Sequence, residues 1–81
     1  MMTLQPQLLQ EIELLMMFDP RNHLEGLKLH HDAEPGKRAA AQRLHEMGII
    51  TLKDGGYLTP RGQEAADLAE TLLSILRVEP R

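Results

Sequence analysis

The chain has 81 residues, 42% of them hydrophobic, and a formal net charge of −3. Its length predicts a single domain over residues 1–81, and with one Phe, one Tyr and no Trp the core must come from aliphatic residues, which suit helices better than sheets. The absence of cysteine excludes disulfides and cysteine-based zinc sites, and the acid-interrupted N-terminal segment excludes a signal peptide or membrane span, so we expect a cytoplasmic protein.

The first predicted element is an amphipathic helix over residues 4–18. Leu8, Ile12 and Leu15 recur at intervals of four and three residues, which places them on one helical face. Asp19-Pro20 predicts the end of this helix, because the residue before a proline is disfavoured in the helical region.

Residues 20–31 leave two interpretations open. The run "GLKLHH" alternates apolar and polar residues, as a half-buried strand does. Residues 20–25 also fit a short helical turn before that run. The sequence therefore does not decide between strand and helix for this segment.

Residues 35–47 predict a second helix. Pro35 suits its first turn, and the run "KRAAAQRLHEM" is rich in residues that favour helices. Gly48 is placed to cap its end in the left-handed conformation, and Ile49 then begins a strand.

A β-hairpin and a third helix follow. The β-prone runs "IITLK" and "GYLT" flank Asp54-Gly55-Gly56, where Asp-Gly predicts a two-residue type I′ reversal and the second glycine permits a bulge. Thr59 can cap a last helix that begins at Pro60 and runs to about residue 77. The expected fold class is α+β and mainly helical, with three main helices, a small antiparallel hairpin and, if residues 27–31 are extended, a third strand.

Two stretches carry a resemblance to known families. The run "RLHEMGIITLKDGGYLTPRGQEA", about a third of the chain, resembles the recognition helix, wing and following helix of winged helix-turn-helix regulators such as the MarR-type proteins. The matching residues are Leu44, Gly48, Ile49, Ile50, Leu58, Thr59 and Gly62. Across nearly the whole chain, "EGLKLHHDAEP", "QRLHEMGIIT" and "DGGYLT" are similar to a small bacterial family without an established activity, some of whose members are labelled DNA-binding proteins.

The resemblance implies a winged-helix-like fold, binding to duplex DNA and a homodimer made by the flanking helices. Winged regulators normally place a clear helix just before the recognition helix, and here residues 19–33 would have to supply it. The charge pattern agrees with a polyanion-facing centre, because residues 21–62 carry seven cations against five acids while both ends are acidic.

Polar residues on the 35–47 helix and around the hairpin are the candidate nucleic-acid contacts. Arg can bind guanine and Gln can bind adenine with two hydrogen bonds, whereas cations near the hairpin can bind phosphates. The predicted nucleic-acid-binding residues are Lys37, Arg38, Gln42, Arg43, Lys53 and Arg61. The alternative is an ordinary solvated helix face and a polar hairpin tip.

The last helix is apolar over more of its surface than a thin core needs, which favours a partner interface. The predicted homodimer residues are Leu68, Leu72, Ile75 and Leu76. The alternative is that the first and last helices pack on each other within one chain.

Catalysis finds little support in the sequence, which has no nucleophile turn, phosphate loop or cysteine. His30-His31-Asp32 suggests a metal site, but adjacent strand residues point to opposite faces, so we expect no metal and no cofactor. The leading hypothesis is a DNA-binding regulatory module that is not an enzyme. The alternative is a protein-interaction or dimerisation domain that does not bind DNA.

Overall fold

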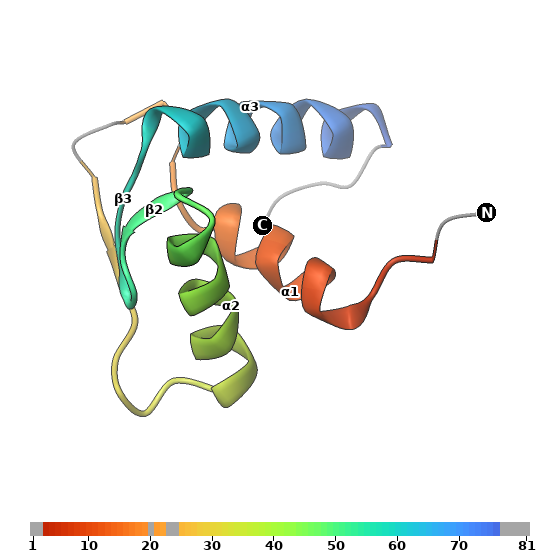
Figure 1. The fold of residues 1–81 in the computed structure, drawn as a ribbon. Helices are drawn as coiled ribbons and strands as arrows, with labels where there is room; N and C mark the ends of the chain where they lie inside the picture. Colours follow the sequence, from red (N-terminus) through yellow and green to blue (C-terminus); the bar gives the residue numbers. More distant parts are fainter. Residues whose placement is uncertain (1–2, 20, 23–24, 77–81) are drawn as a thin grey trace.

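A computed structural model describes residues 3–19, 21–22 and 25–76. The described residues form three helices and a three-stranded antiparallel sheet, which confirms the predicted α+β class and the hairpin (Figure 1). The third strand, which the sequence left open, is present at Leu27–Lys28. The elements in chain order are α1 (Pro6–Leu15), β1 (Leu27–Lys28), α2 (Pro35–Glu46), β2 (Ile50–Leu52), β3 (Gly55–Leu58) and α3 (Pro60–Ile75).

Helix α1 ends at Leu15, four residues before the predicted stop at Asp19-Pro20. Bonds from the amides of Met17 and Phe18 to carbonyls three residues earlier tighten the chain after the helix. This turn carries Phe18 into the core, where it is 5% exposed. Pro20 itself lies outside the described residues.

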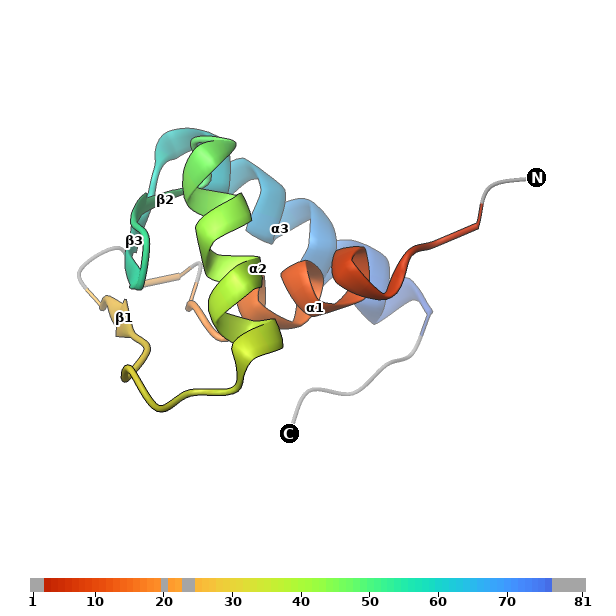
Figure 2. The same cartoon turned by 60° about the horizontal axis from the view of Figure 1, so that its bottom comes forward.

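Helix α2 lies between α1 and the strands, as Figures 1 and 2 both show. Its buried face carries two alanines and Leu44, and the small side chains let α1 approach closely. The helix ends in a Schellman motif, in which Gly48 has a φ of 76° and the Ile49 amide donates to the Leu44 carbonyl over 2.9 Å. The predicted glycine cap is therefore confirmed.

The sheet has the order β1-β3-β2, so the strand nearest the N-terminus pairs with the far arm of the hairpin. The chain reverses at Lys53 and Asp54, one residue earlier than predicted, and the positive φ values fall at Gly55 (131°) and Gly56 (77°). A Cβ at Gly55 would overlap the Leu27 carbonyl, so close approach of β1 explains why glycine follows the reversal.

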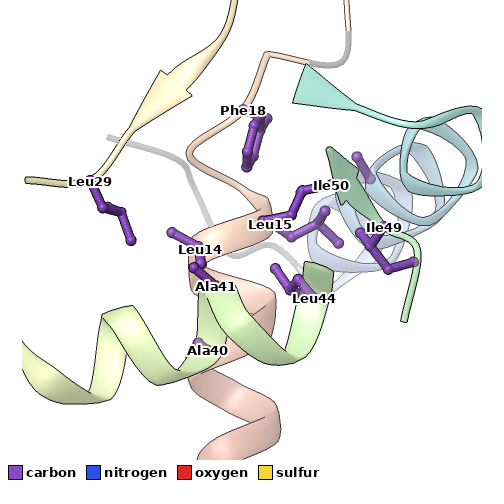
Figure 3. Packing of buried hydrophobic residues seen from close by; sticks show 10 residues of the cluster. Leu14, Leu15, Phe18, Leu29, Ala40, Ala41, Leu44, Ile49 and Ile50 are labelled. Atoms are coloured by element: carbon purple, nitrogen blue, oxygen red, sulfur yellow. The ribbon is translucent and has the colours of Figure 1, made fainter. Parts of the chain in front are cut away.

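Among the described residues, the core is a cluster of ten buried apolar residues from all three helices, the turn after α1, the segment after β1 and the hairpin (Figure 3). Its members are Leu14, Leu15, Phe18, Leu29, Ala40, Ala41, Leu44, Ile49, Ile50 and Ala66. Helix α3 contributes Ala66 to this cluster, and the half-buried Ala65 and Ala69 pack against it.

The first turn of α3 joins the helix to the base of the hairpin. Thr59 caps the helix by accepting the Gly62 amide over 3.0 Å, and its own amide donates to the Ile49 carbonyl over 3.0 Å. Gly62 is buried because its Cα lies against that same carbonyl. The helix ends at Ile75, with Leu76 as its C-cap, about two residues before the predicted end near residue 77.

Candidate nucleic-acid interface

The candidate site is a groove of about 770 Å³ between α2, the segment after β1 and the hairpin reversal. Figure 2 shows that segment and the hairpin on the same side of α2. The lining residues are Lys28, Leu29, His30, His31, Pro35, Arg38, Ala39, Gln42, Lys53 and Asp54. We call this feature the α2 groove.

Helical spacing supplies one wall of the α2 groove. Pro35, Arg38, Ala39 and Gln42 lie at intervals of three, four and seven residues, which is one face of a helix. The opposite face carries the buried alanines and Leu44. The polar stripe is therefore turned outward because the apolar stripe is held against the core.

Strand pairing supplies the other wall. Lys28 pairs with Gly55, which brings a residue of β1 next to the hairpin reversal. The Leu29 amide then donates to the Asp54 carbonyl over 2.8 Å and ties the following segment to the reversal. Side chains 25 positions apart, at Lys28 and Lys53, line one groove as a result.

The α2 groove is positively charged on a chain that is negative overall. Lys28, Arg38 and Lys53 are exposed cations, and Asp54 is the one acid in the lining. Within the described ranges, none of these three cations takes part in an ion pair. Their charge is therefore available to an anionic ligand, where charge-assisted hydrogen bonds are strongest.

The six predicted contact residues separate into three groups. Arg38, Gln42 and Lys53 line the α2 groove, whereas Lys37 and Arg61 are exposed outside its lining. Arg43 is turned toward α1: its Nε donates to the Glu11 carboxylate, and its Nη2 donates to the Gln7 carbonyl over 3.3 Å. This side chain is 32% exposed and Glu11 is 15% exposed, so the pair links the two helices.

Three groove residues whose side chains can donate a hydrogen bond to an anion were not predicted as nucleic-acid contacts: Lys28, His30 and His31. The alternating run "GLKLHH" indicated a half-buried strand, but it did not show which strand β1 pairs with. That pairing is what brings these three residues into the groove. Within residues 3–19, 21–22 and 25–76, no three potential ligands converge to hold a metal ion. The same described residues include no helix long and apolar enough to cross a membrane.

The predicted interface residues of α3 are exposed. The exposed fractions are 65% for Leu68, 53% for Leu72, 71% for Ile75 and 61% for Leu76. Leu4, Leu8 and Leu9, at the start of α1 and just before it, are also exposed. Both terminal helices thus present large apolar side chains to solvent.

Comparison with known proteins identifies a family but no activity. The family described as "Family of unknown function (DUF5669)" matches residues 2–77, and the chain belongs to it. No curated protein and no solved structure matches the chain.

Proposed function

We propose that this chain is a duplex-DNA-binding regulatory module of winged-helix type, without catalytic activity, that acts in the cytoplasm as a homodimer. The α2 groove carries the proposal, because three permanent cations against one acid stand together on a chain of net charge −3. The DNA backbone is a dense array of negative charge, and neutralising it releases counterions, which drives binding.

The groove residues divide by chemistry into two roles. Lys28 and Lys53, on the strand side, suit phosphate contacts that fix the position of the module on the duplex. Arg38 and Gln42, one turn apart on α2, suit base edges, where Arg pairs with guanine and Gln with adenine. Arg43 has no part in this proposal because its guanidinium is engaged by Glu11.

Winged regulators normally place a helix just before the recognition helix, and this chain differs from them at that point. Among the described residues between β1 and α2 there is no helix, and the chain runs through a turn at residues 31–33 instead. In this proposal, the bond between Leu29 and Asp54 takes over part of the positioning by fixing the segment before α2 to the hairpin.

The test is fluorescence anisotropy with a mixed-sequence duplex, starting at about 50 mM salt, where phosphate contacts dominate. We expect the logarithm of the binding constant to fall linearly with the logarithm of salt concentration. The double variant Lys28→Ala/Lys53→Ala should weaken binding roughly tenfold or more and reduce the slope by about 1.8, since each phosphate contact contributes about 0.9.

The matched control is Lys37→Ala/Arg61→Ala, which removes two exposed cations outside the groove lining. This control variant should weaken duplex binding only slightly, because charges outside the groove act on the DNA at longer range and are screened by salt. Absence of duplex binding at low salt, or equal losses in the two double variants, would overturn the proposal.

The exposed face of α3 favours a second candidate function, that of a protein-interaction or dimerisation domain. Leu68, Leu72 and Ile75 recur at intervals of four and three residues, which makes a continuous apolar stripe. Such stripes on exposed helices are typical of partner interfaces. In the first proposal this apolar stripe joins two copies of the DNA-binding chain. In the second, association with a partner through the stripe is itself the function of the domain.

Sedimentation velocity tests the use of this stripe. Leu72→Glu should dissociate a dimer of the wild-type chain, whereas Leu52→Glu should not, although Leu72 and Leu52 are similarly exposed at 53% and 55%. A monomeric wild-type chain at high concentration would contradict both uses of α3 in self-association.

A further inference from the structure

His30 and His31 are two groove residues that neither the DNA-reading face of α2 nor the metal hypothesis accounts for. Both are exposed and both line the α2 groove. The backbone carbonyl of His30 accepts the Ala33 amide over 2.9 Å, which fixes the turn that holds them. Neither imidazole makes a hydrogen bond or ion pair within the described part of the chain.

The charged groups around the two imidazoles come from every wall of the groove. Lys28 belongs to β1, Arg38 to α2, and Lys53 and Asp54 to the hairpin reversal. Asp32 and Glu34 follow along the same segment and are exposed outside the lining. The lining around the two imidazoles therefore holds three cations and one acid.

A phosphate bound in the groove would add negative charge beside the two imidazoles. Histidine is the side chain whose charge ordinarily changes between pH 5 and 8, and the protonated ring has two N–H donors. A bound phosphate attracts the protonated ring and accepts a charge-assisted hydrogen bond from it. Proton uptake by the imidazoles and phosphate binding in the groove therefore favour each other.

We infer that His30 and His31, in their protonated form, bind backbone phosphate in the α2 groove beside Lys28 and Lys53, so that affinity for nucleic acid rises as the pH falls. This inference rests on the proposed function for its ligand. It adds two binding residues and a regulatory property, acid-enhanced binding, to that function.

The first experiment measures duplex affinity between pH 7.5 and 5.5 at constant ionic strength. We expect the affinity of the wild-type chain to rise roughly tenfold or more across this range, and the rise to be largely lost in His30→Gln/His31→Gln. At pH 5.5 the salt slope of the wild type should exceed that of the double variant by about 1.8, and at pH 7.5 the two slopes should agree.

The matched control is His45→Gln. His45 lies on α2, is half-buried and does not line the groove, so this variant should keep the acid enhancement of the wild type. Equal pH dependence in the wild type and in His30→Gln/His31→Gln would overturn the inference and leave DNA binding intact. Loss of the enhancement in His45→Gln would also overturn it, because it would place the titrating group elsewhere.

The second experiment separates this inference from the proposed function by using inorganic phosphate as the probe. Phosphate should shift the imidazole NMR signals of His30 and His31 at pH 5.5 and leave those of His45 in place. If duplex DNA does not bind but phosphate produces these shifts, the proposed function fails and the phosphate site stands. If phosphate produces no selective shift and the duplex does not bind, both fail.

Discussion

Replacement of Gly62 by alanine should destabilise the protein, although Gly62 lies in a helix, where alanine is ordinarily preferred. Gly62 is the third residue of α3 and is buried. A Cβ at this position would overlap the Ile49 carbonyl oxygen and lie 3.0 Å from the carbonyl carbon. That oxygen also accepts the Thr59 amide over 3.0 Å and the Thr59 hydroxyl over 3.2 Å.

The expected magnitude follows from three opposing terms. Alanine gains up to about 1 kcal/mol over glycine in a helix. Overpacking against backbone costs about 1–3 kcal/mol, and moving α3 away weakens the bond from the Thr59 amide to the same oxygen, at about 1 kcal/mol. The balance is a loss of about 1–3 kcal/mol in the free energy of unfolding, which corresponds to a fall in Tm of about 5–20 °C for a domain of this size.

The matched control is Gly36→Ala, also in the first turn of a helix. A Cβ at Gly36 meets the end of the exposed, flexible Gln10 side chain, which can move aside. This variant should be neutral or more stable by about 0.5–1 kcal/mol, because only the propensity gain remains. Thermal and urea unfolding followed by circular dichroism measures both variants, and a Gly62→Ala chain as stable as the wild type would refute the packing argument.

Three further predictions concern single contacts. Thr59→Ala should lose about 1–2 kcal/mol of stability and Thr59→Ser should retain most of it, because the hydroxyl caps α3; urea unfolding of the two variants decides this. A double-mutant cycle on Glu11 and Arg43 should give a coupling free energy of about 1–2 kcal/mol in stability, and additive stability losses would contradict the pairing. Duplex affinity should be less affected by Arg43→Ala than by Arg38→Ala. Gly55→Ala should cost about 2–4 kcal/mol and speed hydrogen exchange at the Leu29 amide, because a Cβ would push β1 off β3; unchanged exchange would argue against the role given to Gly55.

Local signals in the sequence predicted the elements whose ends are set by neighbouring residues. Pro35 and Pro60 mark the starts of α2 and α3, Gly48 marks the end of α2, and Thr59 caps α3, each at the predicted residue. These signals work because a cap or a fixed φ acts within one turn of chain.

Features set by distant partners were predicted less well. The hairpin reverses at Lys53 and Asp54 rather than at Asp54 and Gly55, because β1 packs against Gly55 and needs glycine there. Arg43 was assigned to the DNA-reading face, but Glu11, 32 residues earlier, holds it against α1. The contribution of Lys28 to the groove likewise depends on its pairing with Gly55. None of these partners can be identified from periodicity alone.

The hydrogen bonds of Thr59 affect how two copies of this chain could be arranged in an assembly. The hydroxyl of Thr59 donates to the carbonyl of Gly48, and its amide donates to that of Ile49, so the two ends of the hairpin are clamped together where α2 stops and α3 starts. These two bonds constrain the direction in which α3 leaves the hairpin relative to α2. If two copies associate through the exposed leucines of α3, this clamp holds the α2 groove of each copy at a fixed position relative to the interface between them. The distance between the two grooves of the dimer is then fixed as well.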